Sequence, residues 1–203
     1  MKVALIGATG NIGSRLLAEL TSRGHTVTAL SRNPEKTAAK PGVTAKRGDA
    51  YDKAALADLL KGHDAVISAV RFSASDPQIL IDAVKAAGVK RYLVVGGAGS
   101  LEVAPGHKLI DTPSFPEAYK PEASKGGVFL QLLRGENDLD WTFLSPSALI
   151  SAGTRTGKFR LGGDQLLKDD KGNSSISYED FAVAMVDELE KPKHSRRRFT
   201  VGY

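Results

Sequence analysis

The chain has 203 residues, a formal net charge of +5 and no cysteine. Its length is sufficient for one large domain with a sizeable core, and the lack of cysteine excludes disulfides, thiolate metal sites and cysteine nucleophiles. No stretch is long and apolar enough for a signal-peptide core or a membrane span, so we expect a cytoplasmic protein.

Residues 2–24 predict a strand, a tight turn and a helix. Residues 2–6 are apolar after the first and rich in branched side chains, which is typical of a parallel strand covered on both faces. A helix follows from Ile12 to near Gly24, and one of its faces carries Leu16, Leu17 and Leu20. Between strand and helix, glycines recur at spacing three.

This turn has the chemistry needed to hold a dinucleotide pyrophosphate. Glycine lets the backbone approach the phosphates closely, and the phosphates gain from the free N–H groups and positive dipole end of the helix. A glycine-rich turn that only joins a strand to a helix is the alternative, but the strand and helix on either side favour binding. The predicted cofactor-binding residues here are Gly7, Thr9, Gly10, Asn11, Ile12 and Gly13.

Strand-like and helical runs then alternate along the first half of the chain. Strands are predicted over 26–30, 43–47, 64–70 and 91–96, and helices begin near Pro34, Asp52 and Pro77. Asn33, Asp52 and Asp76 are the expected caps of these helices, and Gly62 and Gly88 are expected helix ends. The alternation predicts an α/β fold, a doubly wound parallel sheet of the Rossmann type.

The second half is less regular. We expect a loop over 96–116, a helix over 121–134, a strand over 141–144, a small hairpin within 157–171, a helix over 178–190 and a last strand over 198–201. The whole chain, 1–203, is predicted to form one dinucleotide-binding domain, with residues 146–178 in a small lobe on the substrate side. The basic tract 191–198 is interpreted as solvated surface, because no aromatic residues interleave with it as a nucleic-acid site would require.

Ligands of doubly wound sheets bind at the carboxyl ends of the strands, so the residues that follow each strand are candidates. Arg32 follows the second strand where an NAD site places a carboxylate, which favours NADP(H) over NAD(H); an ordinary exposed arginine is the alternative. Asp49, followed by Ala50, is expected to accept from the adenine amino group, although it could equally cap a turn before Tyr51. Ala69 and Val70 are expected to line the cofactor groove, and Arg71 to reach a phosphate.

Two residues are candidates for catalysis. Ser100, in the loop after the fifth strand, is placed to donate a hydrogen bond near the nicotinamide, although loop serines often bond to their own backbone. Tyr119 could supply a proton or an aromatic wall, although it could also be a packing residue. Ser145 and Pro146 are expected near the carboxamide. The four histidines lack metal-ligand spacing, so no metal site is expected.

These residues resemble the atypical, extended-type short-chain dehydrogenase/reductases, and in particular the NAD(P)H-binding proteins related to the fungal nitrogen regulator NmrA and to bacterial NADH-flavin reductases. The resemblance covers essentially the whole chain and rests on residues 7–13, 31–34, 48–49, 94–100, 140–142 with 145–146, and 176–182. It implies a Rossmann fold, a reduced nicotinamide cofactor, and reductase activity on a flavin, a quinone or a similar acceptor.

One departure concerns catalysis. Short-chain dehydrogenases use a tyrosine with a lysine four residues later on the same helix face, but Tyr119 has Ala123 at that offset, and Pro121 suggests that Tyr119 precedes the helix. An alcohol dehydrogenase or epimerase mechanism is therefore not expected. A flavin or quinone can take hydride directly, so the first hypothesis is a reductase; the alternative is a non-catalytic NADP(H)-binding redox sensor of the NmrA type. We expect a monomer or homodimer without nucleic-acid or membrane partners.

Overall fold

An eight-stranded sheet forms the centre of the computed structural model, which describes residues 1–203. Its strand order is β10-β12-β8-β5-β4-β1-β2-β3, and every neighbouring pair is parallel except β10 with β12. The order reverses between β1 and β4, which is where this class of sheet binds its ligands. The strands are β1 (Lys2–Ile6), β2 (Thr26–Ser31), β3 (Val43–Arg47), β4 (Ala65–Ser68), β5 (Arg91–Val95), β8 (Asp140–Ser145), β10 (Arg160–Gly162) and β12 (Arg197–Gly202).

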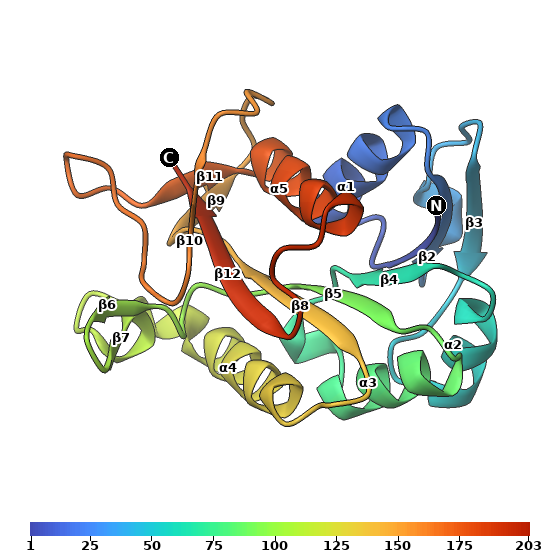
Figure 1. Ribbon diagram of the computed structural model, residues 1–203, viewed down its shortest axis with the longest axis horizontal. Coiled ribbons are helices and arrows are strands. Elements are labelled where there is room, and N and C mark those ends of the chain that lie inside the picture. The colour runs from blue at the N-terminus through green and yellow to red at the C-terminus, as the bar shows by residue number, and fades with distance from the viewer.

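Helices cover both faces of the sheet (Figure 1). On one face lie α1 (Asn11–Ser22) and α5 (Tyr178–Glu190), and on the other lie α2 (Lys53–Leu60), α3 (Pro77–Ala86) and α4 (Lys120–Arg134). Val3 and Leu5 pack in the core under α1 and α5, whereas Ala4 and Ile6 pack in the core under the other helices. Because both faces of β1 are buried, its sequence is continuously apolar rather than alternating. The doubly wound parallel sheet predicted from the sequence is confirmed.

Most of the predicted caps form as expected. The carboxylate of Asp52 accepts from the N–H of Ala55 at the start of α2, and that of Asp76 accepts from the N–H groups of Gln78 and Ile79 at the start of α3. Gly62 and Gly88 follow the ends of these helices with φ of +75° and +74°, values that a glycine adopts without strain.

The prediction of a helix that starts near Pro34 is correct only for a single turn. Only a single 3-10 turn, η1 (Pro34–Lys36), forms there, and the side chain of Asn33 makes no capping hydrogen bond. The residues of this turn bury nothing, so no apolar face stabilises a longer helix.

The hairpin predicted within 157–171 was also wrong. Its strand β10 pairs instead with β12, and Leu161 lies opposite Val201. The local sequence could not show this pairing, because the partner strand lies some forty residues further along the chain.

Short elements occupy the regions outside the main sheet. Residues 96–116, predicted as a loop, contain the hairpin of β6 (Glu102–Ala104) and β7 (His107–Lys108) and the turn η3 (Leu109–Asp111). The turn η2 (Phe72–Ala74) follows β4, and η4 (Glu117–Tyr119) precedes α4. Beyond β8, β9 (Leu149–Ser151) pairs in parallel with β11 (Ser175–Ser177).

The segment 152–158 is fastened to the α1 and α5 layer by buried acidic side chains. Arg155 donates to both carboxylate oxygens of Glu19, at 2.7 and 2.8 Å. The carboxylate of Asp180 accepts from the N–H groups of Thr156 and Gly157, both at 2.8 Å, and from the Tyr203 hydroxyl. The bonds from Arg155 hold the pKa of Glu19 below its ordinary value. Burial alone would raise the pKa of Asp180, but its hydrogen bonds outweigh burial and leave the pKa lowered.

No helix of the structure is both long enough and apolar enough to cross a membrane.

Candidate functional site

The turn between β1 and α1 is built so tightly that two of its glycines are sterically required. A Cβ on Gly13 would lie 2.0 Å from the carbonyl oxygen of Gly7, and one on Gly7, whose φ is +85°, would lie 2.6 Å from the carbonyl oxygen of Ala69. Gly10 differs, because a Cβ there would come no closer than 3.4 Å to any atom of the protein. The fold therefore needs Gly7 and Gly13, whereas the lack of a side chain at Gly10 leaves the outer face of the turn open.

The N-terminus of α1 presents unused hydrogen-bond donors on this outer face. The backbone N–H groups of Asn11, Ile12 and Gly13 have no acceptor within the protein, and Gly10 supplies no side-chain cap. The first turn of the helix contains no acidic residue. Free N–H groups at the positive end of a helix dipole form a site for an anion, and the residues present fit a pyrophosphate.

The end of β2 lies beside this turn, because Leu30 accepts from the N–H groups of Gly7 and Ala8. Arg32, which follows β2, is exposed and makes no hydrogen bond or ion pair within the protein. The hydroxyl of Ser31 is buried and has no partner. A buried hydroxyl without a partner is costly, and the free guanidinium of the next residue in the chain can act as a charge-assisted donor to an anion.

Asp49, after β3, has the turn-capping role that the sequence left open. One of its carboxylate oxygens accepts from the N–H of Tyr51 at 3.0 Å, while Ala50 is buried. The other oxygen makes no bond within the protein, so the adenine contact stays a prediction.

The loop after β4 packs against the glycine turn. The N–H of Ala69 donates to Ile6 at 2.8 Å, which joins this loop to the end of β1, and the side chain of Val70 lies against Gly7. Arg71 is exposed. The glycine turn, Ala69 and Val70 thus meet at the switch point between β1 and β4.

Ser100 and Ser145 lie together at the ends of β5 and β8, joined by a residue from β12. One guanidinium nitrogen of Arg198, Nη1, donates to the hydroxyl of Ser100 at 3.3 Å and to that of Ser145 at 3.4 Å. Ser145 and the adjacent Pro146 are buried, whereas Ser100 is half-buried. Arg198 also forms an ion pair with Asp164.

The sequence predicted that the basic tract 191–198 is solvated along its whole length, and this is wrong for Arg198. The side chain of Arg198 is only 3% exposed, and burial lowers its pKa. His194 stacks on Phe199 at 4.1 Å between ring centroids and bonds through Nδ1 to the buried Glu188. Lys191, Lys193 and Arg197 are exposed. Along this strand Arg198 alternates with the apolar Phe199 and Val201, a pattern that predicts an outward-facing arginine, so no local signal identifies its burial.

Tyr119 precedes α4, as predicted, and is 66% exposed. Ala123, one turn further along the helix, packs against Gly99. A Cβ added to Gly99 would lie only 2.8 Å from the Cβ of Ala123. The position four residues after Tyr119 therefore carries an alanine, beside the loop that carries Ser100, and not a lysine.

Glu122 is a further residue that the sequence did not identify. Its carboxylate accepts from the N–H groups of Phe72 at 2.7 Å and Ser73 at 2.9 Å. It thereby fixes the turn η2, which follows Arg71, against the first turn of α4. Only the three-dimensional contact reveals this role, because fifty residues separate Glu122 from Phe72 in the chain.

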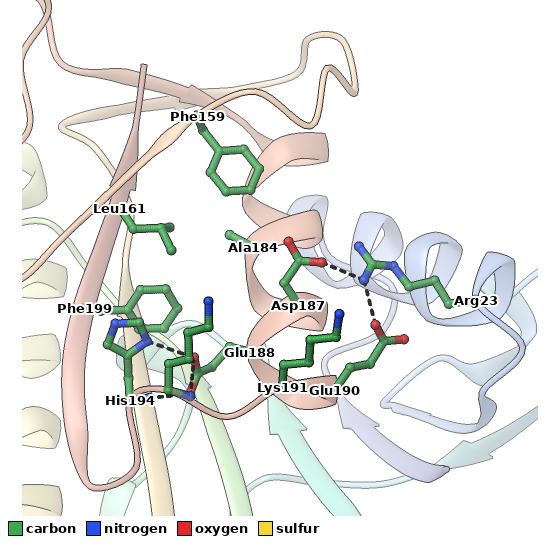
Figure 2. A pocket seen from close by; sticks show the side chains of 11 residues that line it. Arg23, Phe159, Leu161, Ala184, Asp187, Glu188, Glu190, Lys191, His194 and Phe199 are labelled. Carbon is green, nitrogen blue, oxygen red and sulfur yellow. Dashed lines mark hydrogen bonds and ion pairs between the residues drawn. The ribbon is translucent and has the colours of Figure 1, made fainter.

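Two cavities lie outside the glycine turn. One of about 380 Å³ borders Ser100 between the loop 99–111 and α4. The other, of about 320 Å³, lies between α5 and the sheet edge formed by β10 and β12 (Figure 2). In the second cavity, Arg23 is paired with Asp187 and Glu190, and none of the predicted site residues lines it.

Comparison with known proteins agrees with this geometry. The sequence model of a family described as NAD(P)H-binding matches residues 7–192. The uncharacterized protein YwnB of Bacillus subtilis is 43% identical over 213 aligned residues, which cover 99% of this chain and 98% of that protein.

Two solved structures are also similar over their full lengths. A "putative epimerase" from Bacteroides thetaiotaomicron is 46% identical with a TM-score of 0.95, and the match covers 100% of this chain and 96% of that one. A "putative NADH-flavin reductase" from Streptococcus pneumoniae is 38% identical with a TM-score of 0.80, covering 100% and 99% of the two chains. The chain belongs to the NAD(P)H-binding family, among the atypical short-chain dehydrogenase/reductases.

Proposed function

We propose that the protein is a reductase that uses NADPH to reduce a flavin, a quinone or a similar electron-accepting ring. The observation that carries the proposal is the set of free N–H groups at the start of α1, next to the end of β2 and its unpaired Arg32. The similarity to a protein named as an NADH-flavin reductase supports the acceptor class. The similarity to a protein named as an epimerase carries less weight, because the tyrosine and lysine pair of such enzymes is missing here.

The preference for NADPH over NADH rests on the end of β2. Arg32 and the hydroxyl of Ser31 would hold the 2′-phosphate, whereas the residue directly after β2 is not a carboxylate that could accept from a 2′-hydroxyl. The turn from Gly7 to Gly13 would hold the pyrophosphate, and Arg71 would add a further charge. Asp49 would accept from the adenine.

When bound, the nicotinamide supplies the hydride. The residues of the chain would orient the two rings and exclude water between them: Ala69 and Val70 beside the glycine turn, and Ser145 with Pro146 as a buried support near the carboxamide. Ser100 would donate a hydrogen bond to the acceptor. The exposed hydroxyl of Tyr119 would exchange protons with water and serve as a proton source. We assign residues 146–178 to a lobe on the acceptor side, because Asp164 reaches Arg198 beside Ser100.

A redox sensor is the second candidate, and Ala123 in place of the catalytic lysine is the observation that favours it. Such a protein would bind NADP and NADPH with different affinities and turn over neither.

The loss of NADPH absorbance would test the proposal, with purified protein offered FMN, riboflavin and small quinones in turn and NADH as the comparison. Turnover above the non-enzymatic rate, and faster with NADPH, is the expected result. Tight NADPH binding without turnover of any acceptor would favour the sensor.

A further inference from the structure

We infer that Arg198 makes Ser100 a hydrogen-bond donor toward the acceptor, so that the Arg198 and Ser100 pair stabilises an oxygen of the reduced acceptor as it becomes negative. This inference rests on the proposed reductase function. It identifies Arg198 as a positioning residue, because its side chain is buried beneath Ser100 and acts through that hydroxyl.

The contacts of Arg198 are specific. Its Nη1 donates to the hydroxyl of Ser100 at 3.3 Å, and its Nη2 donates to the carbonyl oxygen of the same residue at 3.4 Å. Its Nε bonds to the carboxylate of Asp164 at 2.6 Å. The same carboxylate lies 3.4 Å from Arg134. Asp164 belongs to a segment joined to the loop after β5, since its carbonyl oxygen accepts from the N–H of Glu102 at 2.8 Å.

These contacts determine where the Ser100 hydrogen can go. A serine hydroxyl has one hydrogen and two lone pairs, and Arg198 already occupies a lone pair. The Ser100 hydroxyl donates to no acceptor within the protein. Its hydrogen is therefore available to a ligand, and the guanidinium next to the oxygen strengthens it as a donor. Ser145 also accepts from Arg198, but it is fully buried, so Ser100 is the one that can face a ligand.

The chemistry explains why such a donor is useful. A quinone that takes a hydride, while NADPH becomes NADP⁺, is left as a hydroquinone anion with its charge on a ring oxygen. That oxygen then takes its proton from the Tyr119 hydroxyl, which is replenished from water. A preorganised donor aimed at the developing oxyanion stabilises it more than it stabilises the neutral quinone, and this difference accelerates the reaction.

A double-mutant cycle tests the inference. Arg198→Met removes the charge and keeps most of the bulk, Ser100→Ala removes the hydroxyl, and Arg197→Met is the matched control, since Arg197 is exposed on the same strand. The readouts are kcat for reduction of a benzoquinone, the affinity for NADPH, and the melting temperature. We expect each of Arg198→Met and Ser100→Ala to lower kcat about tenfold or more, with little change in NADPH affinity, and the double variant to be no slower than either.

Two outcomes of this cycle would contradict the inference. If Arg198→Met lowers kcat by the same factor with and without Ser100, or lowers only the melting temperature, Arg198 does not act through Ser100. Arg198→Lys keeps the charge and replaces Arg198→Met in the same cycle if the methionine variant does not fold.

Binding of 4-nitrophenolate, an anionic mimic of the product, to the protein loaded with NADP⁺ separates this inference from the proposed function. We expect both single variants to weaken phenolate binding several-fold and to leave binding of neutral nitrobenzene unchanged. If no acceptor is turned over but this pattern holds, the reductase proposal fails and the assignment of Arg198 stands. If quinones are reduced but both variants bind phenolate as the wild type does, the assignment fails and the reductase stands.

Discussion

The carboxylate of Glu122 accepts a hydrogen bond of 2.7 Å from the backbone N–H of Phe72 and so joins the first turn of α4 to the loop after β4. The ring of Phe72 packs in the core beside Phe143, with 6.4 Å between ring centroids. A Cβ on Gly126 of α4 would lie 2.6 Å from this ring, so the helix and the loop are in close contact. The turn η2, which follows Arg71, is therefore held in place by one acidic side chain and one aromatic ring.

Replacing Glu122 with alanine is expected to destabilise the protein. Two backbone N–H groups would lose their acceptor, which costs about 1–3 kcal/mol in the free energy of unfolding for each group that water does not reach. Urea denaturation would measure this loss. Glu117→Ala is the control, because Glu117 is 83% exposed and pairs only with Lys120. Equal stability of the two variants would contradict the role given to Glu122.

Two glycines of the first turn should respond differently to alanine. Gly13→Ala would place a Cβ 2.0 Å from the carbonyl oxygen of Gly7, so we expect a large fall in melting temperature. A Cβ in Gly10→Ala would come no closer than 3.4 Å to any atom, so the protein should fold normally. It should bind NADPH and NADH more weakly if the turn holds the pyrophosphate as proposed, because the added methyl group would hinder the close approach of the phosphates. Melting curves and cofactor titrations would check both. The larger side chain of Gly10→Val should weaken binding further, and normal NADPH affinity in that variant would contradict the pyrophosphate assignment.

Arg32→Asp should reverse the cofactor preference. The substitution removes a charge-assisted donor and places a carboxylate near the 2′-phosphate, so NADPH affinity should fall about tenfold or more while NADH affinity changes little. Fluorescence titration with each cofactor would measure the two affinities. Lys61→Asp makes the same change of charge at the end of α2 and serves as the control. A similar loss for both cofactors would remove Arg32 from the 2′-phosphate site.

Acid should release the segment 152–158. The pKa values of Glu19 and Asp180 are lowered in the folded protein from ordinary values of 4.5 and 3.8. Each carboxylate therefore adds stability that is fully present above its ordinary pKa and is lost as the pH falls through its lowered pKa. We expect the free energy of unfolding, measured with urea at a series of pH values, to fall below pH 4.5. The fall should be shallower in Glu19→Gln, and an identical slope would contradict this explanation.

The sequence was sufficient for elements whose causes are local. The helix over 178–190 was predicted with its observed bounds, because Ser177 caps it and apolar residues follow at helical spacing. The turn from Gly7 to Gly13 was recognisable because steric crowding permits only glycine at two of its positions. The binding roles of its residues stay predictions.

The features that the sequence did not reveal depend on distant partners. Arg198 was interpreted as solvated surface because no aromatic residues interleave with the basic tract 191–198. Its buried position depends on contacts with Asp164, Ser100 and Ser145. Strand β10 was assigned to a local hairpin because its true partner, β12, is far away in the chain. Contacts of this kind form only when the sheet closes.

The position of β12 between β8 and β10 also has a consequence for protein synthesis. Strands β1, β2, β3, β4 and β5 are adjacent in space and are complete once Val95 has left the ribosome, so the glycine turn and its neighbours can assemble early. Arg198 emerges well after Val95, and until β12 inserts between β8 and β10 the hydroxyl of Ser100 lacks its hydrogen bond from Arg198. The strands around the glycine turn can therefore form before the contacts around Ser100 do.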